Sequence, residues 1–213
     1  MSSEVSKSFL NAFITNLGKY NEGELIGEWV SFPTTCNEIK AVFKRIGIGQ
    51  ADEFGHIYEE WFITDFDCSI GTISAYLCEY ENLDILNYLT STISELNAQD
   101  LEKYTAVLNS ACDSFSGIAD LINLSFNLDC YDYLPGISDK YDLGYYYAIC
   151  AGMYSENIPR DLINYFDFEE FGRDIMINEN GAFHESGYIR RNESNWVKIF
   201  DGAIENIPIK YRL

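Results

Sequence analysis

Three stretches in the N-terminal third of the chain have the composition of strands, and in the second of them hydrophobic and polar positions alternate. These stretches are residues 9–15, 29–32 and 60–66. Between the last two, Thr35 and Glu38 have the spacing of a capping box, and apolar residues then recur at helical spacing up to Gly47. The pattern predicts three strands and a helix, which together form a small α+β domain over residues 1–68.

The pattern changes to a helical period in the middle of the chain. Leu83 and Leu86 begin an apolar stripe that continues on one helical face, and Asn97 is placed as the N-cap of a second helix. Residues 116–124 predict a further short helix. We therefore expect residues 69–126 to form a bundle of short helices.

Mixed structure returns in the last part of the chain. Residues 128–134 have the composition of a strand. Asn180-Gly181, between the apolar residues 175–177 and Phe183, is typical of a hairpin turn. We expect a C-terminal α+β domain over residues 127–213 that includes a dimerisation region.

The predicted fold class is α+β, in an elongated chain of three modules: a small α/β sheet domain, a helical bundle and a C-terminal mixed domain. Of the 213 residues, 47% are hydrophobic and 15% are aromatic, which is enough for a sizeable core. No stretch approaches the roughly 20 apolar residues of a membrane helix, and polar residues interrupt the N-terminal apolar run that a signal peptide needs. The expected location is the cytoplasm. Six cysteines occur singly, which in a reducing compartment is typical of small buried side chains.

Charge restricts the function most. The chain has 34 acidic and 14 basic residues, a net charge of −20. This excludes an ordinary nucleic-acid binder and disfavours an anionic membrane surface, whereas cations or proteins with basic grooves are attracted. Between Arg45 and Lys103, 57 residues contain twelve carboxylates and no Lys or Arg. Residues 189–213 have the opposite balance, with five basic and three acidic residues.

Carboxylates fixed on a folded scaffold can imitate a polyanion. Duplex DNA carries one charge per ~1.7 Å of axis, so 20 charges correspond to about ten base pairs, and a dimer to about twenty. Carboxylates on adjacent helical turns lie about 5–6 Å apart, close to the spacing of successive phosphates. Charge alone therefore permits a DNA mimic without establishing one, because a solvated surface has the same composition.

Residues 16–29, NLGKYNEGELIGEW, with the Phe32-Pro33 that follows, resemble the opening of ArdA-type antirestriction proteins of conjugative transposons and plasmids. Three shorter segments are similar to the end of the first domain of that family and to its C-terminal signature. They are ITDF at 63–66, NYFD at 164–167 and FGRD at 171–174. The resemblance covers about residues 13–183 in order.

The resemblance implies an acidic homodimer with three small domains per chain that imitates bent B-form DNA. Such a protein occupies the DNA-binding groove of type I restriction–modification enzymes, formed by the methyltransferase core and the specificity subunit. It blocks restriction and modification without catalysis, cofactor, metal, nucleic acid or membrane. This chain differs in its basic extension, residues 189–213, which we expect to pack on the dimer seam, cover an edge strand or pair with its own carboxylates.

On this interpretation, nineteen carboxylates are candidate phosphate surrogates, although an ordinary solvated or capping role fits each of them equally well. They are Glu22, Glu24, Glu28, Asp52, Glu53, Glu59, Glu60, Asp65, Asp67, Glu79, Glu81, Asp84, Glu95, Asp100, Glu102, Asp161, Asp167, Glu169 and Glu170. Four aromatic residues are candidates for the dimer interface, with a core position as the alternative. They are Tyr145, Tyr146, Phe166 and Phe171.

Other functions have less support in the sequence. His56 and His184 lie in no nucleophile or metal motif, and adjacent acids such as Glu59-Glu60 point to opposite faces of a strand, which disfavours an enzyme. Residues 65–69 begin like an EF-hand, but Ile70 occupies the glycine position, so only weak divalent-cation binding remains open. An acidic module that binds another basic DNA-binding protein also remains open.

Overall fold

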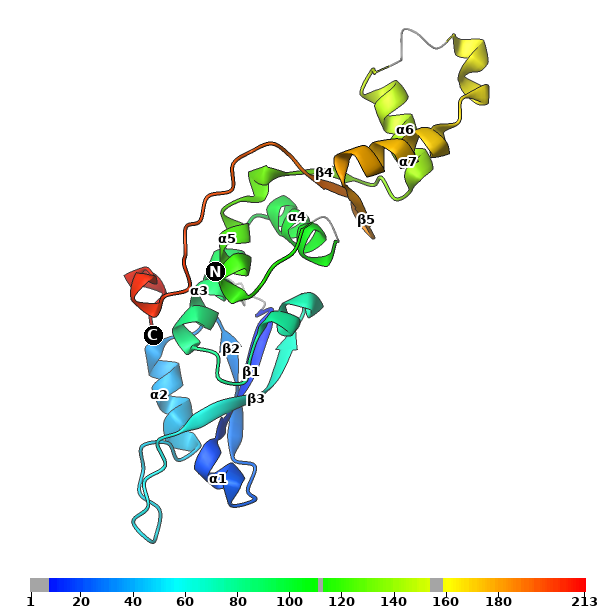
Figure 1. Cartoon of the computed structure of the whole chain (residues 1–213). Helices are drawn as coiled ribbons and strands as arrows, with labels where there is room; N and C mark the ends of the chain where they lie inside the picture. Colours follow the sequence, from blue (N-terminus) through cyan, green and yellow to red (C-terminus); the bar gives the residue numbers. More distant parts are fainter. Residues whose placement is uncertain (1–7, 111–112, 154–158) are drawn as a thin grey trace, which may run out of the picture. The chain divides into compact units, whose positions relative to one another are not determined.

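The computed structural model describes residues 8–110, 113–153 and 159–213 (Figure 1). Helices and strands are mixed along the chain, and the strands form two antiparallel three-stranded sheets. This arrangement confirms the predicted α+β class. The division into three modules stays a prediction.

Contacts group the chain into two compact units, and each unit combines segments that are distant in sequence. Unit 1 consists of Met1–Leu96, Ser116–Ser125 and Lys198–Leu213. Unit 2 consists of Asn97–Phe115 and Phe126–Val197. The last residues of the chain therefore belong to the same unit as the first strand.

The sheet of unit 1 contains the three strands that the sequence predicts. β1 (Leu10–Asn16) lies between β2 (Gly27–Phe32) and β3 (Trp61–Cys68), and pairs with both in antiparallel register. The short helix α1 (Leu17–Asn21) follows β1, with the Asn16 side chain as its cap. From Leu10 to Ile14 the residues of β1 alternate between buried and half-buried, so the two faces of this part of the strand differ in burial, and Thr15 and Asn16 are buried as well.

α2 (Cys36–Arg45) begins where the capping-box spacing places it. The Thr35 hydroxyl accepts a hydrogen bond from the Glu38 backbone N–H at 3.3 Å. The Glu38 side chain does not close the box but pairs with Arg45 at 2.8 Å. The chain leaves the helix at Gly47, whose φ of 81° is a left-handed conformation that favours glycine.

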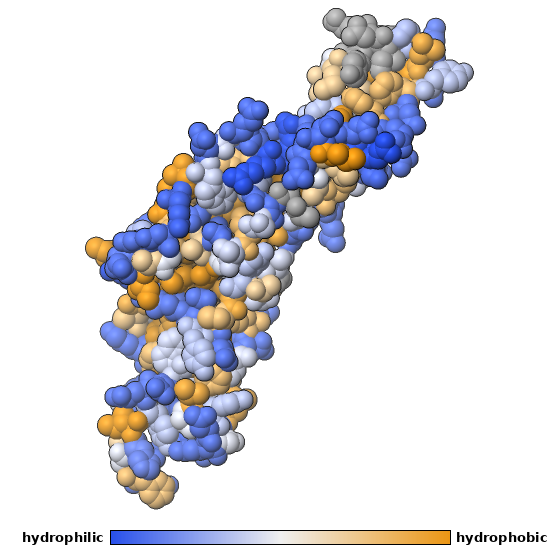
Figure 2. Space-filling view, in the orientation of Figure 1, coloured by the Kyte–Doolittle hydropathy of each residue, from blue (hydrophilic) through white to orange (hydrophobic). Residues whose placement is uncertain are grey.

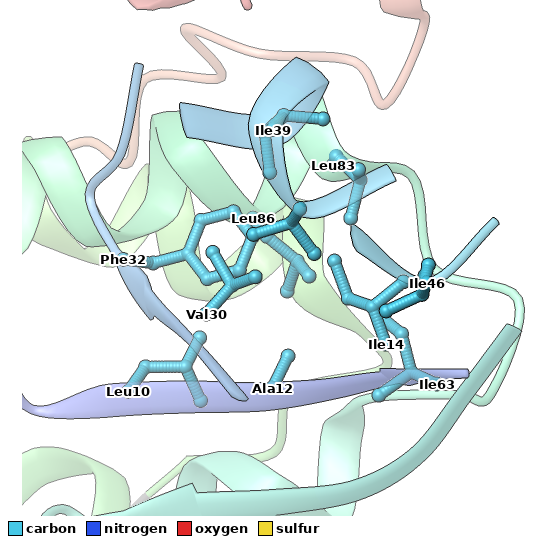
Figure 3. Packing of buried hydrophobic residues seen from close by; sticks show 11 residues of the cluster. Leu10, Ala12, Ile14, Val30, Phe32, Ile39, Ile46, Ile63, Leu83 and Leu86 are labelled. Carbon is cyan, nitrogen blue, oxygen red and sulfur yellow. The ribbon is translucent and has the colours of Figure 1, made fainter. Parts of the chain in front are cut away.

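The core of unit 1 lies on one face of its sheet. Figure 3 shows Leu10 and Ala12 of β1 on the side of the strand from which Ile39 of α2 and Leu86 approach. The fully enclosed members of this cluster are aliphatic apart from one phenylalanine. They are Leu10, Ala12, Ile14, Val30, Phe32, Ile39, Val42, Ile46, Ile63, Leu83 and Leu86.

The three predicted helices of the middle region are present: α3 (Leu83–Ser94), α4 (Ala98–Asn109) and α5 (Ile118–Ser125). Asn97 caps α4 as expected, since its side chain accepts from the backbone N–H groups of Gln99 and Asp100. α3 and α5 pack together in unit 1, whereas α4 packs against a strand of unit 2. Short 3-10 turns occupy Gly71–Tyr76, Leu128–Cys130, Arg160–Tyr165, Ile204–Asn206 and Ile209–Tyr211.

The sheet of unit 2 has the order β4-β6-β5. β4 (Tyr131–Pro135) lies in the stretch predicted as a strand, although the first residues of that stretch form a 3-10 turn. β5 (Ala182–His184) and β6 (Gly187–Arg191) form a hairpin. The central strand therefore includes residues 189–191, which the sequence analysis assigned to the basic extension.

Two helices of unit 2 contact each other at glycine residues. α6 (Lys140–Tyr145), which continues as a π turn, packs against α7 (Phe168–Glu179). A Cβ on Gly172 would overlap the carbonyl oxygen of Lys140, and one on Gly144 would overlap that of Phe168. The absence of side chains at both glycines lets the two backbones touch.

The predicted hairpin at Asn180-Gly181 is wrong. Residues 175–177 belong to α7, and Asn180, with φ of 49°, is the left-handed C-cap of that helix. The turn of the real hairpin falls at residues 185–186, between His184 and Gly187. The error has a physical reason, because the left-handed conformation that asparagine tolerates serves helix ends as well as hairpin turns.

The C-terminal segment Lys198–Leu213 is fastened to the helices of unit 1. Phe200 is buried and lies edge-on to Tyr88, on which Tyr211 stacks at 4.7 Å. The Asn123 side chain bonds both the backbone N–H and the carbonyl of Phe200, at 2.8 and 2.7 Å. These contacts give the segment a defined place in the fold of its own chain.

The five described cysteines are free thiols, namely Cys36, Cys68, Cys78, Cys130 and Cys150. Only Cys130 is buried, so the expectation of buried side chains is wrong for Cys78 and Cys150, which are exposed. Cys112 lies outside the described residues.

Candidate partner-binding surface

The candidate carboxylates fall into two groups. Eight are exposed and, within the part of the chain that the structure describes, neither form an ion pair nor accept a hydrogen bond from another side chain, although Asp65 accepts one from the backbone N–H of the next residue, Phe66, at 2.8 Å. They are Glu24, Glu53, Glu59, Glu60, Asp65, Glu79, Asp161 and Glu169. Six of the eight belong to unit 1. We refer to these eight residues as the unpaired carboxylates.

The other eleven candidates are engaged within their own unit. Each accepts a hydrogen bond from a cation, hydroxyl, thiol, amide or backbone N–H. They are Glu22, Glu28, Asp52, Asp67, Glu81, Asp84, Glu95, Asp100, Glu102, Asp167 and Glu170. Asp167 accepts from the Glu170 N–H at 3.0 Å and so caps α7, which is the alternative role that the sequence allowed.

Glu22 shows how the engaged carboxylates are held. It accepts from the Tyr58 hydroxyl at 2.7 Å and from Lys19 Nζ at 2.9 Å. These two hydrogen bonds, that of Tyr58 first, lower the pKa of Glu22 below its usual value. The ring of Tyr58 lies so close to Gly18 that a Cβ there would overlap it. Glycine at this position therefore lets the tyrosine reach the carboxylate.

Asp52 is held by backbone groups of the loop that follows α2. Its carboxylate accepts from the N–H groups of Phe54 and His56 at 2.9 and 2.8 Å. Burial opposes its ionisation, but these hydrogen bonds outweigh burial and lower the pKa of Asp52. Asp52 thus shapes the loop, which reduces its availability to a partner.

Arg45 at the end of α2 is the last basic side chain before the stretch without Lys or Arg. It binds Glu28 of β2 through two nitrogens, both at 2.8 Å, and also pairs with Glu38. The hydrogen bond from Arg45 lowers the pKa of Glu28. Glu28 therefore ties a strand to a helix and is not free of cations.

The sheet of unit 2 contains a charged cluster that the candidate residues omit. Arg190 of β6 pairs with Asp132 of β4 at 2.8 Å and with Glu179 of α7. The hydroxyls of Tyr147 and Tyr188 donate to Glu179 at 2.9 and 3.1 Å. Burial, together with the charge of Glu179, raises the pKa of both tyrosines. Arg190 and Asp132 lie opposite each other in the sheet. Only the fold reveals this register, so no local pattern in the sequence indicated the cluster.

The basic C-terminal extension pairs with carboxylates of its own chain, as one of the three expectations stated. Lys210 lies 3.1 Å from Glu95, and the Tyr211 hydroxyl donates to the same carboxylate. The backbone N–H of Leu213 donates to Asp84 at 2.6 Å. Glu95 and Asp84 therefore hold the end of the chain.

The four aromatic candidates for a dimer interface lie in unit 2. The rings of Phe166 and Phe171 contact each other edge-on, with their centres 5.5 Å apart, and Phe171 packs on the hydrophobic cluster of this unit. Tyr145 is 40% exposed, and Tyr146 is half-buried. Phe171 thus has the core position that was the alternative, while a dimer contact by the other three stays a prediction.

Across residues 8–110, 113–153 and 159–213, no three His, Cys, Asp or Glu side chains are grouped to hold a metal ion. In the same residues, no helix combines the length and apolar composition that crossing a bilayer requires. Figure 2 shows a mainly hydrophilic face on which apolar residues surface in separate places.

Comparison with known proteins assigns the family. The model of a family described as Antirestriction protein (ArdA) matches residues 12–190. No curated protein matches the chain. The matched region includes the segment 16–29 and ends within β6. Because the match extends over far more than half of the 213 residues, the chain belongs to the ArdA family of antirestriction proteins.

Proposed function

We propose that this antirestriction protein is an acidic DNA mimic carried by a mobile genetic element such as a conjugative transposon. It occupies the DNA-binding groove of a type I restriction–modification enzyme, which the methyltransferase core and the specificity subunit form. By competing with DNA it blocks both restriction and modification, so that incoming DNA escapes. The mechanism needs no catalytic group and no cofactor.

The observation that carries this proposal is the set of unpaired carboxylates on a folded scaffold. A net charge of −20 repels itself, and a disordered tail would avoid that cost, but these carboxylates lie on folded units. In unit 1 they lie on β3 and on loops, and in unit 2 they lie on a 3-10 turn and on α7. A groove lined with Lys and Arg would neutralise them, as it neutralises phosphates. Complementary charge also speeds encounter with such a groove.

The proposal includes a homodimer. One chain carries the charge of about ten base pairs of duplex, and two chains carry that of about twenty. The exposed aromatic side chains near α6 and α7, such as Tyr145 and Tyr165, are the surface that we assign to the contact between copies. Their burial between two chains would remove apolar area from water.

A competition experiment tests the proposal. A type I methyltransferase bound to a labelled duplex of about 30 base pairs is titrated with this protein at about 50 mM and about 200 mM salt. We expect stoichiometric displacement that weakens at the higher salt, because both rivals bind through charge. A folded protein that fails to displace the duplex at low salt would refute the proposal and favour another basic partner.

A matched series of variants tests whether the charge acts as a distributed surface. Replacing Glu53, Glu59 or Glu60 singly by Gln should change displacement only slightly, whereas the triple variant should weaken it clearly. Loss of displacement from one of these substitutions alone, with the fold intact, would contradict distributed mimicry and indicate a specific contact.

A further inference from the structure

The exposed face of the unit 1 sheet carries a cluster of aromatic side chains. Phe13 of β1 lies edge-on to Trp29 of β2, with ring centres 5.2 Å apart. Phe62 of β3 contacts Tyr20 edge-on at 5.1 Å and stacks with Tyr80 at 6.3 Å. Tyr20 belongs to α1, whereas α2 and α3 pack on the opposite face of the sheet.

An open groove of about 540 Å³ is lined by four rings of this cluster, those of Phe13, Tyr20, Trp29 and Phe62. Trp29 is 46% exposed and Tyr20 is 49% exposed, which is unusual for large apolar side chains next to a packed core. Gly27 of β2 shapes the floor, since a Cβ there would lie 2.6 Å from the Phe13 ring. Exposed aromatic patches of this kind commonly mark interaction sites.

The rim of the groove is negatively charged. Asp65 of β3 and Glu79 line it, and both belong to the unpaired carboxylates. The backbone carbonyl of Glu79 accepts a hydrogen bond from Ile63 at 2.7 Å, which fixes Glu79 beside the sheet. No Lys or Arg is among the described residues that line the groove. The groove therefore combines aromatic faces and carboxylates without a cation.

Elsewhere in the described residues, an aromatic ring and a carboxylate occur together with a cation in three places. In each case a Lys or Arg lies over an aromatic ring, 4.2–5.7 Å from its centre, and pairs with a carboxylate at 2.7–3.1 Å. The three groups are Lys19 with Tyr58 and Glu22, Lys210 with Tyr211 and Glu95, and Arg191 with Trp196 and Asp113. The groove presents the same combination, aromatic rings beside carboxylates, to an external cation.

We propose that the groove binds an arginine side chain from a basic loop of the partner protein. The planar guanidinium stacks on Trp29 or Tyr20 and donates hydrogen bonds to Asp65 and Glu79. Arginine suits the groove better than lysine, because it stacks on rings and is less strongly hydrated. The inference rests on the proposed function for the identity of the partner, and it adds an aromatic anchor to a surface otherwise recognised by charge.

Variants that keep the net charge test the groove in the displacement assay. Trp29→Ala and Tyr20→Ala should each weaken displacement of duplex from the methyltransferase by about tenfold, the effect of an interface hot spot. Phe54→Ala, an equally charge-neutral change at a side chain that is 78% exposed and outside the groove, is the control. If wild type displaces the duplex and both groove variants match it, the groove inference is wrong and the proposed function stands.

A second measurement does not depend on the enzyme. Calorimetry compares the binding of a tetra-arginine peptide and a tetra-lysine peptide, which have equal charge. We expect the arginine peptide to bind several-fold more tightly, and Trp29→Ala to remove that preference. Such a result would support the groove even if wild type failed to displace DNA.

Two results would overturn the inference. Equal affinity of wild type for both peptides would show that the aromatic floor does not select arginine. Sedimentation tests the alternative that a second copy of this chain occupies the groove. If Trp29→Ala weakens self-association, the groove is an interface between copies and does not receive a basic loop.

Discussion

The two sheets of the molecule have the same pairing, a central strand between two antiparallel neighbours, yet they use charge in opposite ways. In unit 1 the interior is aliphatic, and Asp65 on the exposed face has no cation beside it. In unit 2 the central strand contributes Arg190, which lies between Asp132 and Glu179. A carboxylate in this acidic protein therefore either stabilises the fold through donor groups of its own chain or is available to a partner.

The first way to test this contrast is to remove aliphatic volume from unit 1. Ile14 is fully buried at the centre of β1. Ile14→Ala should reduce the free energy of unfolding by about 3 kcal/mol, from lost burial and the cavity left behind. Urea unfolding followed by the fluorescence of Trp29 and Trp61 measures this loss. Ile57→Ala, at a position 60% exposed, is the control and should stay within about 0.5 kcal/mol.

The second way is to remove the cation of unit 2. Arg190→Met should cost about 2 kcal/mol, because Glu179, whose side chain is only 17% exposed, loses its charged partner. Arg45→Met is the matched control. Arg45 pairs with two carboxylates but is 48% exposed, so its loss should cost less than about 1 kcal/mol.

Amide hydrogen exchange can assign each loss to its sheet. Arg190→Met should speed exchange in β4 and β6, and Arg45→Met should leave those amides unchanged. If Arg45→Met reduced the free energy of unfolding more than Arg190→Met, the proposed division between structural and available carboxylates would be wrong.

Alkaline pH offers a third and smaller perturbation of unit 2. The pKa values of Tyr147 and Tyr188 are raised in the folded protein by burial and by Glu179, while unfolded tyrosine titrates near 10. Above pH ~10 the unfolded chain loses these protons first, so stability falls as pH rises. The expected loss is about 1 kcal/mol between pH ~10 and ~11, and Tyr147→Phe should reduce it. A slope that this substitution leaves unchanged would assign the loss to other tyrosines.

Local elements could be predicted from the sequence because their causes are local. Strand-like composition identified β1 and β3, alternation identified β2, and the side chains of Thr35 and Asn97 cap their own helices. The hairpin predicted at Asn180-Gly181 was wrong because local patterns can be ambiguous. A short apolar run has no clear period, and a left-handed asparagine ends a helix as readily as it turns a hairpin.

The pairing of carboxylates could not be predicted, because partners come from distant parts of the chain. Glu95 is held by Lys210, 115 residues away, and Glu179 is held by an arginine of the neighbouring sheet. Charge counting identified the acidic stretch, most of which lies in unit 1, but it treated Glu95 and Glu79 as equivalent. Their difference depends on the fold alone.

The fourth prediction concerns the unpaired carboxylates themselves. Asp65→Asn combined with Glu79→Gln should change stability by no more than about 0.5 kcal/mol, because both side chains are exposed and hold no cation. Asp132→Asn, which weakens the pair with Arg190, is the comparison and should cost about 1 kcal/mol. Urea unfolding of both variants decides the point, and a larger loss from the double variant would give Asp65 and Glu79 a structural role.

The smallest expected effect is that of salt, and it separates repulsion from attraction. Screening weakens the Arg190 pairs of unit 2, but it also weakens the repulsion within a chain of net charge −20. Because repulsion involves many more charges, Tm should rise by a few degrees between about 20 mM and about 200 mM salt. The same salt should weaken displacement of DNA from the methyltransferase. The double variant Asp65→Asn with Glu79→Gln should show a smaller rise, since less repulsion remains to be screened. A Tm that stays flat in wild type would mean that the unpaired carboxylates do not strain the fold, and the main cost that partner binding is proposed to relieve would be absent.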